Sequence, residues 1–264
     1  MTTYTAGHIS AFFDNWAPES TKLDYDNIGL LTGSKNKPVK KVLTCLDVTE
    51  DVVDEALDLK CDLIVAHHPV IFKKLSRINP DNDIGKVLYK LISNDIAVLA
   101  VHTNLDAARG GVSFVMASQL SLKKNTFLTR EENGPIPHGL GVIGEFDTKL
   151  GESDFLEHVK IKLNCDVIRY SGSRGSIGKV AVCGGSGFSL AQSAMTLGAD
   201  AYITSDIKYH DFFTGKTDFM LLDVGHYESE SPIINIMRDV LRTKFPELIV
   251  ESTSVNTNPI QTYK

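Results

Sequence analysis

The feature of this sequence that most constrains its fold is a pattern that recurs 138 residues further along the chain. The matched residues are Lys41 and Lys179, Val42 and Val180, Cys45 and Cys183, Ala56 and Ala194, and Asp62 and Asp200. In each half, an apolar segment leads into a helical pattern and then into a second apolar segment that ends in polar residues. A single repeat of this length indicates an internal duplication rather than a solenoid. It predicts two similar α/β lobes whose strand ends surround one cleft, where ligands bind in such folds.

Alternating strand and helix patterns support this fold class. The predicted strands are 42–48, 62–66 and 96–102, and the predicted helices are 8–16, 49–59 and 84–94. Near-continuous apolar strands that alternate with helices are typical of a parallel α/β sheet. Residues 26–34 are expected to form a loop or short strand, and the turn-forming, charged stretch 129–139 predicts a boundary. We therefore expect a first lobe over residues 1–130 and a second lobe over residues 131–264.

The composition excludes several classes of protein. Hydrophobic residues make up 42% and charged residues 23% of the chain, as in folded globular proteins, and the net charge of −6 argues against binding to nucleic-acid phosphates. No apolar run approaches the roughly 20 residues of a membrane span, and residues 1–10 lack the pattern of a signal peptide. The cysteines contain no CxxC pair and are expected to be buried thiols; they are Cys45, Cys61, Cys165 and Cys183. A cytoplasmic protein is expected.

Two adjacent histidines, His67 and His68, follow the predicted strand 62–66 and precede Pro69. Successive residues of an extended chain point in opposite directions, so two nearby metal ions could each take one ring. A loop with two solvated histidines is the alternative. Asp106 follows the next strand and could be a further metal ligand, or it could instead cap a turn.

A second pair of candidate ligands, His226 and Glu230, lies four residues apart just before the helix that Pro232 is expected to begin. Glu230 could alternatively complement the helix dipole. Together with His67, His68 and Asp106, these residues supply three imidazoles and two carboxylates at predicted strand ends. This donor set suits Zn²⁺, Mn²⁺, Fe²⁺, Co²⁺ or Ni²⁺ rather than Ca²⁺ or Mg²⁺. Five ligands for two ions require a bridging carboxylate and leave positions for water, which favours hydrolysis.

Six segments resemble the GTP cyclohydrolase 1 type 2 homologue family, also called Nif-three-like dinuclear-metal proteins. They are DNIGLLTGS (26–34), CLDVTEDVVDEA (45–56), DLIVAHHPVIF (62–72), AVHTNLDAARGGV (100–112), GADAYITSDIKYHDF (198–212) and DVGHYESE (223–230). The resemblance implies that His67, Asp106 and Glu230 hold one metal ion, and that His68 and His226 hold the other with Glu230 bridging. It also implies a toroidal homohexamer with its sites facing the inner cavity. Ser205 departs from the glycine expected in its turn.

Three further features are candidates for supporting roles. His102 matches His226 in the repeat and is expected to support a ligand or to shuttle a proton, with a structural histidine as the alternative. His210 and Asp206 could contact substrate or belong to a solvated loop. The turn 184–187 (GGSG) could hold a phosphate, but it lacks the Lys and Ser/Thr of a P-loop and is expected to be a packing turn.

The favoured function is therefore a metal-dependent hydrolase with two divalent metal ions per chain and an unknown small-molecule substrate. The family name does not by itself establish cyclohydrolase activity. The first alternative is a non-catalytic metal-binding or regulatory ring, whose ions join the two lobes. The second is a ring that threads single-stranded nucleic acid, against which the acidic balance argues.

Overall fold

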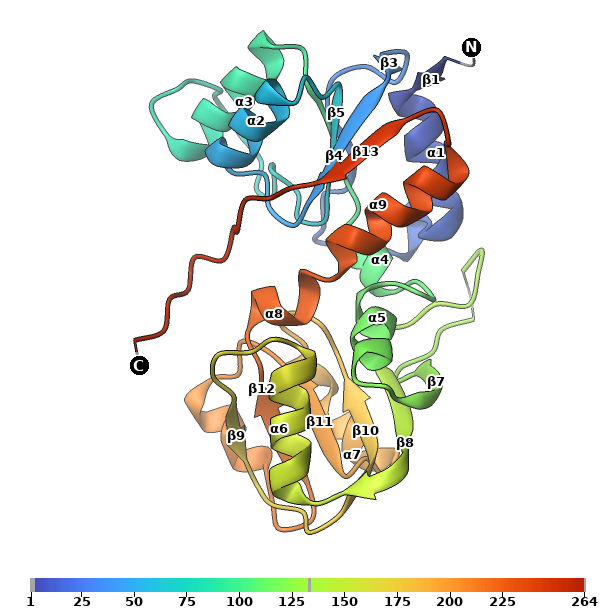
Figure 1. Ribbon diagram of the computed structural model, residues 1–264, viewed down its shortest axis with the longest axis vertical. Coiled ribbons are helices and arrows are strands. Elements are labelled where there is room, and N and C mark those ends of the chain that lie inside the picture. Colours follow the sequence, from blue (N-terminus) through green and yellow to red (C-terminus); the bar gives the residue numbers. More distant parts are fainter. Residues whose placement is uncertain (1–2, 133, 264) are drawn as a thin grey trace. The chain divides into compact units, whose positions relative to one another are not determined.

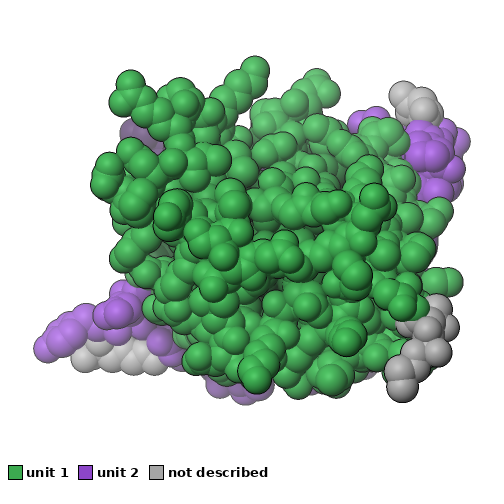
Figure 2. All heavy atoms as spheres, turned by 90° about the horizontal axis from the view of Figure 1, so that it is seen from above, with its two compact units in different colours: residues 1–105, 233–259 green, residues 106–232, 260–264 purple. Residues whose placement is uncertain are grey.

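The computed structural model describes residues 3–132 and 134–263 and places them in two compact units (Figures 1 and 2). Unit 1 comprises Met1–Leu105 and Ile233–Pro259, and unit 2 comprises Asp106–Pro232 and Ile260–Lys264. The chain therefore leaves unit 1 after Leu105 and returns to it at Ile233. This division differs from the single boundary expected near residue 130.

Unit 1 is built on a five-stranded sheet with the order β13-β4-β5-β6-β2. Its strands are β2 (Gly29–Thr32), β4 (Lys41–Cys45), β5 (Leu63–Ala66), β6 (Ala97–Ala100) and β13 (Ile249–Ser252). All neighbours pair in parallel except β2, which pairs antiparallel to β6 at one edge. A separate antiparallel pair joins β1 (Tyr4–Thr5) to β3 (Pro38–Val39). The expected parallel sheet is thus present with one antiparallel edge strand.

Helices cover both faces of this sheet (Figure 1). They are α1 (Ala6–Trp16), α2 (Glu50–Asp58), α3 (Asp83–Ser93) and α9 (Ile233–Lys244), with a short 3-10 turn η1 (Glu19–Thr21). Alternation along β4 separates the two faces, because Leu43 and Cys45 pack with α2 and α3 whereas Thr44 donates a hydrogen bond to the carbonyl oxygen of Ile234 in α9. The central strands β4, β5 and β6 are buried on both faces, which explains their continuous apolar sequence.

Unit 2 is built on a six-stranded mixed sheet with the order β7-β8-β10-β11-β12-β9. Its strands are β7 (Lys123–Phe127), β8 (Val142–Leu150), β9 (Arg169–Ser171), β10 (Ile177–Val182), β11 (Ala201–Thr204) and β12 (Met220–Asp223). Its helices are α5 (Val112–Gln119), α6 (Glu152–Lys162), α7 (Ala191–Thr196) and α8 (His226–Glu230), with η2 (Phe188–Leu190) and η3 (Tyr209–Thr214). The central strands β10, β11 and β12 are parallel. One face packs against α5 and α6, and the other packs against α7.

Core packing explains why the division does not fall near residue 130. Met116 of α5 and Leu120, which follows the end of α5, are buried in one cluster with Val142 and Phe155 of unit 2, so this segment cannot belong to the first core. At the other end of the chain, β13 pairs with β4 and completes the sheet of unit 1. The turn-rich stretch 129–139 instead connects the antiparallel strands β7 and β8. Turn chemistry marks a chain reversal here, but it does not show which core the flanking elements join.

The two sheets share the register that the repeat predicts. Val42 pairs with Leu63 in unit 1, and Val180 pairs with Ala201 at the same offset in unit 2. The third strand follows another offset, because Ala66 lies opposite Ala100 whereas Thr204 lies opposite Asp223. His102 therefore corresponds to the residue before His226, not to His226 itself.

The four cysteines are free and buried, as expected from their apolar surroundings. The small helix α4 (Thr103–Asp106) contains the point at which the chain leaves unit 1. Within residues 3–132 and 134–263, no helix is both long and apolar enough to cross a membrane.

Candidate metal centre

Three imidazole rings meet at the strand ends of unit 1. His67 and His68 follow β5, and His102 follows β6, the neighbouring parallel strand. The ring centroids of His67 and His68 lie 5.0 Å apart, and each lies 5.2–5.3 Å from that of His102. One potential ligand atom from each ring lies within 4.8 Å of the others. The adjacent histidines do not diverge as an extended chain would require, because the backbone bends directly after β5.

Each of these rings is oriented through its Nδ1 atom. Nδ1 of His67 lies 2.9 Å from the carbonyl oxygen of Val101, Nδ1 of His68 lies 2.7 Å from Oδ1 of Asp47, and Nδ1 of His102 lies 2.9 Å from Oδ1 of Asp26. A carbonyl or carboxylate oxygen only accepts, so each Nδ1 donates its proton and the lone pair of the neutral ring is on Nε2. Histidines that bind metals through Nε2 are held in this way.

Asp26 is a buried anion that orients His102. Its Oδ2 accepts hydrogen bonds from the amide and the hydroxyl of Thr103, at 3.0 and 2.5 Å. Burial by itself raises the pKa of Asp26, but the hydrogen bonds from His102 and Thr103 outweigh it and lower the pKa to about 2. Asp26 is therefore charged at neutral pH and stabilises the Nδ1–H tautomer of His102.

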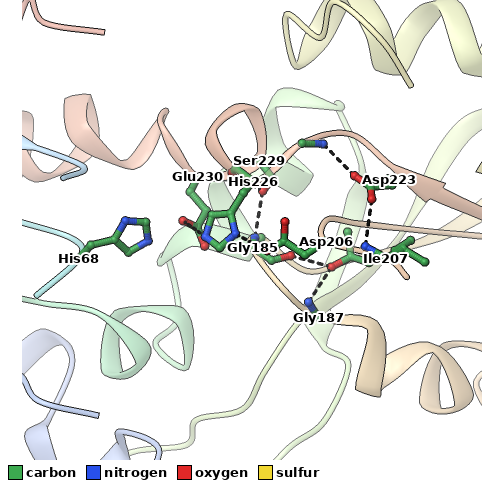
Figure 3. A network of polar contacts seen from close by, with 12 residues as sticks. His68, Gly185, Gly187, Asp206, Ile207, Asp223, His226, Ser229 and Glu230 are labelled. Carbon is green, nitrogen blue, oxygen red and sulfur yellow. Dashed lines mark hydrogen bonds and ion pairs between the residues drawn. The ribbon is translucent and has the colours of Figure 1, made fainter. Parts of the chain in front are cut away.

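In unit 2, His226 lies with three carboxylates, those of Glu230, Asp206 and Asp106; Figure 3 labels His226, Glu230 and Asp206. Nε2 of His226 lies 3.0 Å from Oε2 of Glu230, one turn further along α8, and Nδ1 of His226 lies 2.7 Å from Oδ2 of Asp206. A carboxylate oxygen of Asp106 lies within 4.8 Å of one of Glu230. Glu230 is buried, and two close carboxylates in such a place are a typical arrangement for cation binding.

Two carboxylates determine the charge of His226. Burial by itself lowers its pKa, but the hydrogen bonds to Glu230 and Asp206 and their negative charges raise the pKa to about 9. Below that pH the metal-free ring is an imidazolium that neutralises one charge of the acidic group. A divalent cation between the same groups would serve the same electrostatic purpose.

The glycine turn after β10 packs against Glu230. A Cβ atom on Gly185 would lie 2.2 Å from Oε1 of Glu230, and one on Gly184 would lie 2.4 Å from Val112. The amide of Gly185 donates to Oγ of Ser229, whose hydroxyl donates to the carbonyl oxygen of His226 (Figure 3). The packing role predicted for this turn is confirmed, and the turn leaves room for the Glu230 carboxylate.

Comparison with known proteins now decides the family. The sequence matches the model of the Duf34/NIF3 (NGG1p interacting factor 3) family over residues 4–259. The chain belongs to the Duf34/NIF3 family. This confirms the resemblance seen in the sequence, because relatives of this chain carry the name GTP cyclohydrolase 1 type 2 homolog.

Its relatives in the Duf34/NIF3 family match over nearly their whole lengths. A Clostridium acetobutylicum protein named GTP cyclohydrolase 1 type 2 homolog is 32% identical over 256 residues, 95% of each chain. A Staphylococcus aureus hypothetical protein of known crystal structure has a TM-score of 0.89 and 30% identity, covering 99% of this chain and 100% of that one. Reduced HcgD from Methanocaldococcus jannaschii has a TM-score of 0.80 and 25% identity, covering 97% and 100%. The mixed α/β fold is shared across them.

The five ligands expected in this Duf34/NIF3 chain are divided between the units: His67 and His68 in unit 1, and Asp106, His226 and Glu230 in unit 2. His102 joins the unit 1 group. His210 lies in the exposed turn η3, where its ring contacts Tyr209 and Phe213.

Sequence reasoning missed two orienting carboxylates, Asp47 and Asp26. Asp47 lies near the end of the predicted strand 42–48. This position at a strand end was the available signal. Asp26 comes before the sheet begins, and nothing in its local sequence indicates that it contacts His102.

Proposed function

We propose that this Duf34/NIF3 chain holds two divalent metal ions with ligands from both units and uses them to hydrolyse a small molecule. One observation carries the proposal: the three histidines of the expected ligand set, His67, His68 and His226, each hold Nδ1 on an oxygen acceptor, which leaves Nε2 as the nitrogen that can bind a metal ion.

The donor chemistry of the two units is complementary. Unit 1 supplies imidazole nitrogens, and unit 2 supplies one imidazole and the carboxylates of Asp106 and Glu230. A mixture of imidazole and carboxylate suits first-row divalent ions, whereas either group alone is incomplete for a pair of ions. In the proposed arrangement, Glu230 bridges, with His67 and Asp106 on one ion and His68 and His226 on the other.

The path of the chain supports joining the two groups. The chain leaves unit 1 after Leu105, and Asp106 is the next residue. The chain returns to unit 1 at Ile233, three residues after Glu230. A chain of four residues spans at most roughly 14 Å, so Asp106 cannot lie far from His102. Both carboxylates are thus tethered next to unit 1 by covalent connections.

The chemistry divides between the bound ions and the side chains. Held by the imidazoles and carboxylates of both units, paired ions would activate water for attack and would stabilise negative charge that develops on the substrate. Asp47 and Asp206 hold the Nδ1 protons of His68 and His226 and so keep both rings in position. His102 is outside the proposed ligand set, and Asp26 fixes its proton on Nδ1, so its Nε2 is placed to accept a proton from water or substrate.

Metal content tests the proposal first. Elemental analysis of untagged protein should give two ions per chain, and His67→Ala and Glu230→Gln should each lose most of this metal. His210→Ala is the matched control, because His210 is exposed and belongs to none of the candidate ligand groups among the described residues, and it should keep both ions. Less than one ion in the wild-type chain, or full loading of His67→Ala, would contradict the proposal.

Turnover tests hydrolysis separately. Metal-loaded protein should hydrolyse members of a panel of phosphoesters, nucleotides, amides and esters, and His102→Ala should retain metal while turnover falls by about 100-fold or more, as for loss of a general base. Inactivity of the loaded protein across the panel would favour the second candidate, in which the ions only join the units. That candidate is favoured by the division of the expected ligands between units 1 and 2.

Assembly stays a prediction. Six copies of a 29.0 kDa chain should elute together if the toroidal homohexamer forms, and light scattering would measure the mass. A monomer or dimer at micromolar concentration would contradict it.

A further inference from the structure

A pocket of about 460 Å³ lies beside His68 within unit 1. Its apolar wall consists of Val48, Pro69, Val70, Ile84 and Val87. The volume is within the range of cavities that bind small molecules. Because His68 and its orienting partner Asp47 also line the pocket, a molecule seated there would adjoin the proposed metal site.

The described residues that line this pocket include four carboxylates and no lysine or arginine. The carboxylates belong to Asp47, Glu50, Asp51 and Asp83. Glu50 is neutralised from outside the pocket, because Lys86 and Lys90 lie 2.7 and 3.4 Å from its oxygens. Asp47, Asp51 and Asp83 leave three negative charges around an apolar cavity.

Two helices begin at the pocket and oppose this charge only in part. The first turns of α2 and α3 contribute Asp51 and Asp83, and a helix N-terminus carries roughly half a positive charge. Two such termini do not balance three carboxylates. The capping amides are also engaged, since the side chain of Thr49 accepts from Val52 and that of Asn82 accepts from Gly85. The pocket therefore disfavours an anion.

We propose that this pocket binds the body of a small cationic substrate, with an apolar chain against the valines and an ammonium or amidinium group attracted by the lining carboxylates of Asp51 and Asp83. That the bound molecule is a substrate rests on the proposed hydrolase function; the binding itself does not. The substrate class is then an amide or ester of an amine-bearing aliphatic molecule. The negative charge of the lining disfavours the phosphate groups of a nucleotide.

Binding of simple probes tests the charge preference. In methyl NMR spectra of the full chain, butylammonium should shift the signals of Val48, Val70 and Val87 at lower concentration than butyrate or inorganic phosphate. Asp51→Asn and Asp83→Asn should each raise the Kd for butylammonium by about fivefold, as expected for loss of the attraction of one solvated charge. Asp58→Asn, at the exposed end of the same helix α2, is the matched control and should leave the Kd unchanged.

A filling variant tests the location. Ile84 is 42% exposed, so Ile84→Trp should fold and should abolish the butylammonium shifts by occupying the cavity. Tighter binding of butyrate or phosphate than of butylammonium, or an unchanged Kd in the Asp51→Asn/Asp83→Asn double variant, would overturn the pocket proposal.

Metal content measured on the same samples separates the two proposals. Butylammonium binding to a chain that holds no metal would leave the pocket proposal standing and refute the metal site. Two bound ions per chain, together with equal binding of butylammonium and butyrate, would support the metal site and refute the pocket proposal.

Discussion

Asp62 and Asp200 occupy equivalent places in the two sheets and perform the same structural task. Oδ2 of Asp62 accepts from the amides of Lys40 and Lys41, and Oδ2 of Asp200 accepts from those of Gly178 and Lys179. Each carboxylate thus fixes the start of the neighbouring parallel strand. The repeat in the sequence therefore preserves a specific pair of hydrogen bonds, not only a hydrophobic pattern.

Asp200→Asn should lower the free energy of unfolding by about 1.5–3 kcal/mol, the range for hydrogen bonds to a charged group. Burial by itself raises the pKa of Asp200, but the amides of Lys179 and Gly178 and the Arg174 guanidinium outweigh it and lower the pKa. A lowered folded-state pKa gives stability that is present above the unfolded value of about 3.9 and is lost as pH falls through the folded value. Urea unfolding of both proteins should show a constant difference at pH 6–8 that shrinks below about pH 4. A difference that grows in acid would refute this account.

Gly185→Ala should disturb both stability and metal content. Its φ of +63° is costly for alanine, by roughly 1–3 kcal/mol, and the added Cβ would displace the Glu230 carboxylate. Gly175→Ala is the control, since a Cβ there meets nothing within 4 Å and its φ is outside the left-handed region. Denaturant unfolding and elemental analysis should show losses only in the first variant. Equal metal content in both variants would contradict the role assigned to the glycine turn.

Asp206→Asn should weaken metal binding by about 10- to 100-fold, as when a carboxylate behind a ligating histidine is lost. Asparagine tolerates the left-handed backbone of this position, where φ is 56°, so the fold should be retained. Competition with a chromogenic chelator would measure the affinity. Asp211→Asn is the control. Asp211 lies in η3, and its side chain has no described hydrogen bond to the four oriented histidines, so this variant should bind metal like the wild type.

Chelation should lower the stability of the loaded protein. An ion present at 100 times its Kd stabilises the folded chain by about 2.7 kcal/mol, and this contribution disappears when the ion is removed. Thermal unfolding with and without a chelator would measure the change. The His67→Ala variant should unfold at the same temperature with and without chelator. If chelator lowers its unfolding temperature as much as that of the wild type, the stabilising ions are not bound by His67.

Much of the fold could be predicted because its signals are local. The strands expected over 42–48 and 62–66 correspond to β4 and β5, and the helix expected over 84–94 corresponds to α3, shifted by one residue. Apolar continuity and Thr49 as a helix cap depend only on neighbouring residues. The positions of His67 and His226 after parallel strands were predictable for the same reason.

The remaining features depend on distant partners. The contact of Asp26 with His102 joins residues 76 positions apart, and the pairing of β13 with β4 joins segments at opposite ends of the chain. Hydrophobic pattern does not specify such partners, so the unit division and the orientation of His102 required the structure. The bend that brings His67 and His68 together likewise overrides the alternation expected of an extended chain.

The return of the chain to unit 1 has a consequence for biosynthesis. β13 covers the outer edge of β4, and α9 covers one face of the same sheet, yet both are translated after the other elements of that sheet. While the ribosome is still making residues 233–252, the nascent first sheet exposes an apolar face and an unpaired strand edge, which are aggregation hazards. Residues 106–232 form one continuous stretch of sequence and can complete their core earlier. We therefore expect residues 106–232 to complete their core before the first sheet does, and truncation before Ile249 leaves that sheet without β13.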